Sequence, residues 1–161
     1  MIVIVIIGVV YSLSVNSFQR LSDETNIVTL SSLKRYLQNI DYSKNIQILC
    51  LDECNSCDVL VDGKKTTTLD NFVDDSIKVY RYDFLDGFIE KEKDTYFNIE
   101  DVEEEVCFSY AITKDGVGEQ VLVEFKDKFY DFSTYLENTL VYSSIEEANK
   151  FKEDLAKEVM N

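Results

Sequence analysis

The first fifteen residues, Met1–Val15, constrain this chain more than any other stretch. They carry no charged side chain and are interrupted only by Gly8, Ser12 and Ser14. A helix that is apolar on all sides is stable in a lipid bilayer or among similar helices. Spanning the hydrocarbon core takes about 20 apolar residues, so the run is short for a complete membrane helix. We therefore expect 1–15 to be a transmembrane segment whose first turns precede Met1.

The segment MIVIVIIGVV resembles the N-terminal helix of type IV pilins and of the pseudopilins of type II secretion systems. The residues that carry this resemblance are Met1, Ile2, Val3, Ile4, Val5, Ile6, Ile7, Gly8, Val9 and Val10. In that family prepilin peptidase removes a basic leader that ends in Gly, and a hexapeptide containing Glu follows. The resemblance implies that this hexapeptide precedes Met1, which brings the apolar run to about 21 residues.

The resemblance implies a structural subunit of a type II secretion or type IV pilus-like filament. Its expected partners are other pilin or pseudopilin subunits, the inner-membrane assembly platform, the lipid bilayer and, for the full-length precursor, prepilin peptidase. Before assembly the chain is expected to be a single-pass protein of the bacterial inner membrane with its globular domain in the periplasm. The absence of the family's calcium loop favours a minor pseudopilin. The sequence does not distinguish a secretion system from a type IV pilus or a DNA-uptake system.

The segment Asn16–Ile40 contains no Gly or Pro, and its apolar residues recur mostly at steps of three, four or seven. This spacing predicts that the helix continues to residue 40 with one apolar stripe. We expect that stripe to pack on a sheet through four residues, Leu21, Val28, Leu33 and Leu37. The sequence thus predicts one long helix over 1–40, apolar in 1–15 and amphipathic in 16–40.

From Asn45 onward the pattern changes to short apolar or alternating runs, which are typical of strands. Asp62-Gly63 marks a two-residue hairpin turn between two of them. The order of the runs indicates an antiparallel meander. The expected strands are Asn45–Leu51, Cys57–Val61, Lys64–Leu69, Ile77–Tyr82, Val106–Thr113, Gln120–Phe125, Phe129–Phe132 and Thr139–Tyr142.

Ser144 and Glu147 form the capping-box pattern that begins a helix. We therefore expect a terminal helix over 144–160, within an extracytoplasmic domain over 41–161. The predicted fold class is α+β and pilin-like: a long N-terminal helix packed on an antiparallel sheet, with a C-terminal helix.

Four cysteines, Cys50, Cys54, Cys57 and Cys107, are the candidate disulfide residues. In an extracytoplasmic domain paired cysteines are expected, although a structural metal site of four thiolates is an alternative. The spacing of the first three also matches an iron–sulfur motif of radical enzymes, but the order of elements does not supply the βα barrel of that family. Four cysteines allow three complete pairings, and the sequence does not choose among them.

The formal net charge of −15 argues against binding to nucleic acid, because the phosphate backbone would be repelled. The sequence contains no His and no Gly-rich phosphate loop, so it lacks residues that many enzymes use for acid–base catalysis and for phosphate binding. We therefore expect neither an enzyme nor a cofactor or metal site, and the acidic run Asn98–Glu105 is interpreted as a solvated loop. Two alternatives remain: a membrane-anchored periplasmic binding or adaptor domain, and a Cys-based metal or redox protein.

Overall fold

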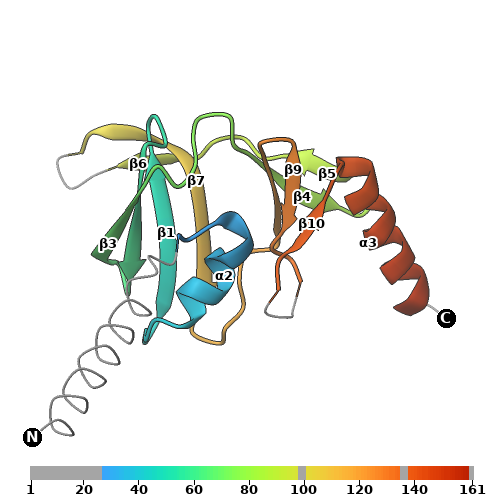
Figure 1. The fold of residues 1–161 in the computed structure, drawn as a ribbon, viewed down its shortest axis with the longest axis horizontal. Helices are drawn as coiled ribbons and strands as arrows, with labels where there is room; N and C mark the ends of the chain where they lie inside the picture. Colours follow the sequence, from blue (N-terminus) through green and yellow to red (C-terminus); the bar gives the residue numbers. More distant parts are fainter. Residues whose placement is uncertain (1–26, 98–100, 135–137, 160–161) are drawn as a thin grey trace, which may run out of the picture.

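The computed structural model describes residues 27–97, 101–134 and 138–159, which form two five-stranded antiparallel sheets and two helices (Figure 1). The strand order is β3-β2-β1-β7-β6 in the first sheet and β10-β9-β8-β4-β5 in the second. The first sheet contains β1 (Asn45–Leu51), β2 (Ser56–Val61), β3 (Lys64–Asp70), β6 (Thr95–Phe97) and β7 (Glu103–Thr113). The second contains β4 (Lys78–Asp83), β5 (Gly87–Glu90), β8 (Val121–Phe125), β9 (Lys128–Asp131) and β10 (Leu140–Tyr142). The helices are α2 (Leu30–Gln38) and α3 (Ile145–Val159).

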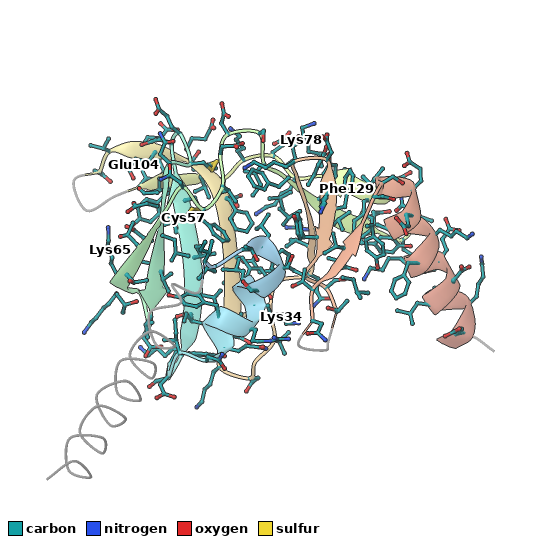
Figure 2. The ribbon with its side chains drawn as sticks, in the orientation of Figure 1. Lys34, Cys57, Lys65, Lys78, Glu104 and Phe129 are labelled. Carbon is teal, nitrogen blue, oxygen red and sulfur yellow. A yellow bond between two sulfur atoms is a disulfide. The ribbon has the colours of Figure 1, made fainter. Side chains whose placement is uncertain are left out.

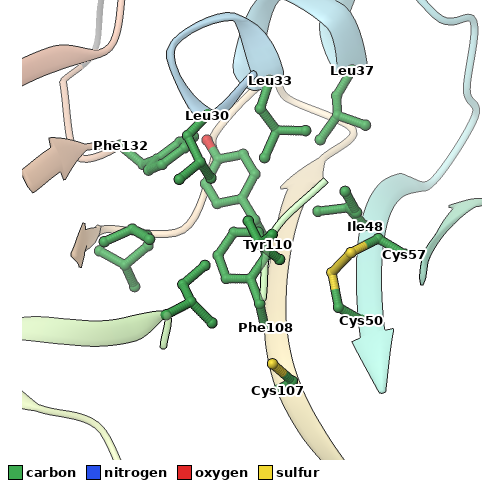
Figure 3. Packing of buried hydrophobic residues seen from close by; sticks show 14 of the residues in the cluster. Leu30, Leu33, Leu37, Ile48, Cys50, Cys57, Cys107, Phe108, Tyr110 and Phe132 are labelled. Atoms are coloured by element: carbon green, nitrogen blue, oxygen red, sulfur yellow. A yellow bond between two sulfur atoms is a disulfide. The ribbon is translucent and has the colours of Figure 1, made fainter. Parts of the chain in front are cut away.

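Both sheets and α2 contribute to one hydrophobic core. Leu33 and Leu37 of α2 are fully buried and point toward Tyr110 of β7 and Ile48 of β1 (Figure 3). Val123 of β8 brings the second sheet into the same core. Burying one leucine contributes about 1.5–3 kcal/mol, so the short helix is held mainly by its packing.

The long N-terminal helix packed on the sheet, and with it the pilin-like α+β fold class, is a wrong prediction. Within the described part of the chain the first helix begins at Leu30, after the extended residue Thr29 (φ −121°, ψ 165°). Thr29 acts as the N-cap: its amide donates to Ser32 Oγ at 3.0 Å, and the Ser32 amide donates to the Thr29 carbonyl at 3.0 Å. A residue with extended φ and ψ cannot continue a helix. The apolar spacing in 16–40 therefore wrongly predicted one helix that passes through Thr29 without interruption.

The predicted single meander is also wrong, because two pairings join strands that are distant in sequence. β7 pairs with β1, and β8 pairs with β4, which separates the strands into two sheets. β5 and β6 were not predicted. The Asp62-Gly63 turn is present, with φ of 52° and 80°, as a two-residue hairpin requires. The β8–β9 turn uses Lys126 and Asp127 at φ of 50° and 58° without any glycine.

α3 packs on the face of the second sheet that is turned away from the core (Figure 1). Its buried Ala148 belongs to the same cluster as Leu122 and Tyr80, whereas Val123, the next residue along β8, faces the core. Ser144 Oγ accepts the Glu147 amide at 3.2 Å and begins the helix. The Glu147 carboxylate accepts the amide of Ser143 at 2.9 Å, one residue before the position expected in a capping box.

No helix in residues 27–97, 101–134 and 138–159 is long and apolar enough to cross a bilayer. α3, the longer of the two, has 15 residues and carries charged side chains along its length. The predicted location as a single-pass inner-membrane protein is contradicted by this finding. The segment 1–15, on which that prediction depended, lies outside the described residues.

Gly118 gives a first testable prediction, because Tyr110 leaves no room for a side chain there. A Cβ at Gly118 would lie 2.0 Å from the Tyr110 hydroxyl oxygen, which is buried and has no hydrogen-bond partner among the described residues. We expect Gly118→Ala to lower the free energy of unfolding by about 1–3 kcal/mol through overpacking. Tyr110→Phe removes the clashing oxygen and is expected to be close to neutral on its own.

Urea denaturation of the two single variants and the double variant measures the coupling between these positions. Gly118→Ala combined with Tyr110→Phe should recover part of the loss, with a coupling of at least about 0.5 kcal/mol. Strictly additive effects would show that the Tyr110 hydroxyl does not limit the space at Gly118.

Candidate functional site

The residues predicted from sequence to act in packing lie in two different parts of the chain. Leu33 and Leu37 are buried in the core, and the half-buried Val28 packs against it. Leu21 and the ten residues Met1–Val10 lie outside the described residues. The structure therefore shows only the C-terminal end of the predicted amphipathic stripe, which packs in the core. The predicted membrane segment lies outside the described residues.

The four cysteines form two disulfides, Cys50–Cys57 and Cys54–Cys107. Cys50 and Cys57 stand directly opposite each other on β1 and β2, with Cα atoms 4.1 Å apart (Figure 3). The second disulfide joins the β1–β2 loop to β7, with Cα atoms 5.8 Å apart. No free cysteine and no metal-binding group of His, Cys, Asp or Glu occurs in the part of the chain that the structure describes.

The acidic run Asn98–Glu105 is described only from residue 101. Glu103, Glu104 and Glu105 belong to β7 and pair with β6, so this part is a strand rather than the expected solvated loop. Glu105 forms an ion pair with Lys93.

A surface groove of about 610 Å³ lies where the ends of β4 and β8 meet α3. We call it the β4–α3 groove. Its volume falls within the range of about 300–1,000 Å³ that is usual for sites of small ligands. It is lined by Arg81, Tyr82, Phe88, Lys91, Glu119, Gln120, Val121, Ser133 and Lys152. Figure 2 shows the side chains of the domain and labels Lys78 of β4 and Phe129 of β9, which belong to the same sheet as the groove.

One wall of the groove is aromatic and well supported. The Tyr82 and Phe88 rings meet edge to face, with their centroids 5.2 Å apart. The Phe88 amide donates to Asn149 Oδ1 of α3 at 3.1 Å, which ties β5 to the helix. Asn149 Oδ1 also lies 2.7 Å from the position that a Cβ at Gly87 would occupy, so glycine permits this close approach. The wall is therefore fixed by β4, β5 and α3 together.

Two of the three cations in the groove already have acidic partners. Lys91 is paired with Asp94 at 2.5 Å, and Lys152 with the buried Asp131 at 3.1 Å. Lys152 also donates to Ser133 Oγ. Lys91 and Lys152 are therefore both engaged in ion pairs, and the charge of Lys91 also acts on Glu119.

Arg81 and Glu119 are different, because neither side chain forms a hydrogen bond or an ion pair with any residue that the structure describes. Desolvation raises the pKa of the Glu119 carboxyl, and the nearby charges of Lys91 and Arg81 oppose that rise. The Glu119 backbone is held by its amide, which donates to the Ala111 carbonyl at 3.0 Å. One cation and one carboxylate thus lie in the groove close enough to interact but not bonded.

Sequence reasoning missed this groove. Its residues come from β4, β5, β8, α3 and the segments between them, and only the pairing of β4 with β8 brings them together. The alternation in Lys78–Asp83 placed its tyrosines on one face of a strand. The same alternation puts Arg81 on the face of the strand opposite to the tyrosines. This was the only indication in the sequence that Arg81 and the tyrosines have different surroundings.

No protein-family model, no curated protein and no solved structure matches this chain.

Proposed function

We propose that this chain is a non-enzymatic structural subunit of a type II secretion or type IV pilus-like filament, in the role of a minor subunit. The observation that carries the proposal is the uncharged segment Met1–Val10, with its resemblance to the pilin N-terminus. Neighbouring subunits would pack these segments together, and Gly8 would allow close approach. The two-sheet domains would lie on the outside of the filament core that these segments form.

The geometry of the described domain supports a mechanical role. α2 is the first described helix after the N-terminal segment and buries Leu30, Leu33 and Leu37 in the core. The domain that contains it is cross-linked by two disulfides, which would help it to resist mechanical load. Disulfides persist in oxidising compartments, which supports a location in the periplasm or outside the cell.

The proposal predicts that a charge within the N-terminal segment abolishes assembly. The full chain carrying an affinity tag is expected to co-purify from its source cells with proteins that have similar apolar N-termini. Val5→Asp should lose these partners, because a carboxylate is costly to bury among apolar helices. Val117→Asp is the matched control, since Val117 is 40% exposed on the described domain.

Equal recovery of pilin-like partners with Val5→Asp and with the unsubstituted chain would contradict the proposal. So would the absence of any pilin-like chain from the unsubstituted sample. Non-reducing electrophoresis establishes that both variants keep their disulfides.

A further inference from the structure

β6 is an edge strand of the first sheet with exposed aromatic side chains. In the order β3-β2-β1-β7-β6 its one neighbour among the described strands is β7. All three of its residues are exposed, and Tyr96 and Phe97 keep 39% and 59% of their surface accessible to solvent. The outer side of such a strand presents unpaired backbone amides and carbonyls, to which another extended chain can add.

The part of β7 that pairs with β6 is acidic and extends past the end of β1. β1 pairs with β7 from Val106 onward, whereas Glu103–Glu105 pair with β6. Lys93 forms an ion pair with Glu105. The Glu103 carboxylate forms no hydrogen bond or ion pair with any residue that the structure describes. This two-stranded ribbon of β6 and Glu103–Glu105, the β6–β7 ribbon, therefore carries excess negative charge.

Two aromatic rings of β6 stand directly opposite glutamates of β7. Phe97 is paired with Glu103, and Tyr96 with Glu104, which is labelled in Figure 2. Successive residues of a strand point to opposite faces, whereas directly opposite residues of two strands share a face. Each face of the β6–β7 ribbon thus has one ring beside one carboxylate. This combination suits a Lys or Arg side chain, through a cation–π contact and an ion pair.

We propose that β6 binds an extended segment of a partner protein that contains two consecutive basic residues. The segment adds to the outer side of β6 as an antiparallel strand, with its basic residues opposite Tyr96 and Phe97. Because consecutive residues point to opposite faces, one cation lies with Tyr96 and Glu104 and the other with Phe97 and Glu103. Adjacent strands are about 4.8 Å apart, so a long basic side chain can pass over the ring to the carboxylate beyond it.

The charge of the whole chain agrees with a basic partner. A formal net charge of −15 attracts a cationic segment and repels an acidic one. That attraction acts on any cation, whereas the two ring–carboxylate pairs favour basic residues at consecutive positions. The inference does not depend on the proposed filament role, because it uses only described residues of the domain.

Two-dimensional NMR of the isotopically labelled full chain tests the proposal with three peptides of equal charge. Ac-TVKKVT-NH2 has consecutive lysines, and Ac-TKVKVT-NH2 has the same composition with both lysines on one face. The third peptide repeats the first but carries N-methyl groups at alternate residues, on the amides that would donate to β6. We expect the first peptide to shift the amide signals of β6 and to bind at least fivefold more tightly than the other two.

Two variants test the carboxylate and the ring. Glu103→Gln and Phe97→Leu should each weaken the binding of Ac-TVKKVT-NH2 by about threefold, as expected for exposed contacts. Glu153→Gln is the matched control for charge, because Glu153 is exposed on α3. Phe84→Leu is the matched control for the ring, because Phe84 is 74% exposed between β4 and β5. Neither control should change the affinity.

The proposal is overturned if Ac-TVKKVT-NH2 shifts no β6 signal at 10 mM, or if the isomeric or N-methylated peptide binds as tightly. It is also overturned if Glu153→Gln weakens binding as much as Glu103→Gln, which would show a general effect of charge. The peptide comparison uses the unsubstituted chain, so it decides the question even if a variant fails to fold.

Discussion

Replacing Cys54 and Cys107 together with alanine is expected to lower the free energy of unfolding by about 4 kcal/mol. This disulfide closes a loop with a sequence separation of 53 residues and joins the β1–β2 loop to β7. Breaking it frees a long stretch of the unfolded chain, which gains conformational entropy. Equilibrium urea denaturation without reductant, followed by circular dichroism, measures the change.

The Cys50–Cys57 disulfide is the matched control, because it has the same chemistry and a sequence separation of only 7 residues. Replacing both of its cysteines with alanine is expected to cost about 2 kcal/mol. All four cysteines are at most 4% exposed, so the two double variants remove similar buried surface. Equal losses, or a larger loss for Cys50–Cys57, would show that loop length does not determine the contribution of these disulfides.

Lys152→Met is expected to lower the free energy of unfolding by about 3–5 kcal/mol, because it removes the ion-pair partner of a buried carboxylate. Asp131 is fully buried and its Oδ2 atom lies 3.1 Å from Lys152 Nζ, whose side chain is only 15% exposed. The other oxygen, Oδ1, accepts the Ser133 amide at 2.8 Å. This ion pair links α3 to the second sheet, and urea denaturation again measures its loss.

Two further variants separate the charge from the packing of the side chain. Lys150→Met lies on the same helix at an exposed position and should change stability by less than about 0.5 kcal/mol. Asp131→Asn combined with Lys152→Met removes the buried charge and keeps an acceptor for the Ser133 amide. This pair should recover most of the loss, whereas no recovery would mean that Lys152 contributes through packing alone.

Local features were predictable from sequence where one or two residues determine the backbone. Asp62-Gly63 identified the β2–β3 hairpin because few other pairs adopt two positive φ angles easily. The Lys126-Asp127 turn adopts the same backbone without a glycine and gave no comparable signal. At Thr29 a signal was present and was overlooked. Thr29 followed by Ser32 is a capping pattern, but the apolar spacing on both sides of it suggested one continuous helix.

Long-range pairing could not be predicted from this sequence. β1 pairs with both β2 and β7, and only the first of these partners is its neighbour in the chain. Hydrophobic alternation is satisfied equally by one sheet or by two, so it did not separate the strands into two sheets. The same limit applied to the cysteines and to the groove, since Cys107 and Arg81 acquire their neighbours only through those pairings.

Photo-cross-linking from Val5 in the source cells tests the central claim most directly. A photoreactive amino acid at Val5 should form adducts with chains that carry a similar apolar N-terminal segment, identified by mass spectrometry. The same amino acid at Lys64, on the exposed strand β3, serves as the control and should not give those adducts. Adducts from Val5 only with unrelated proteins, or none in cells that contain the folded chain, would contradict a role as a filament subunit.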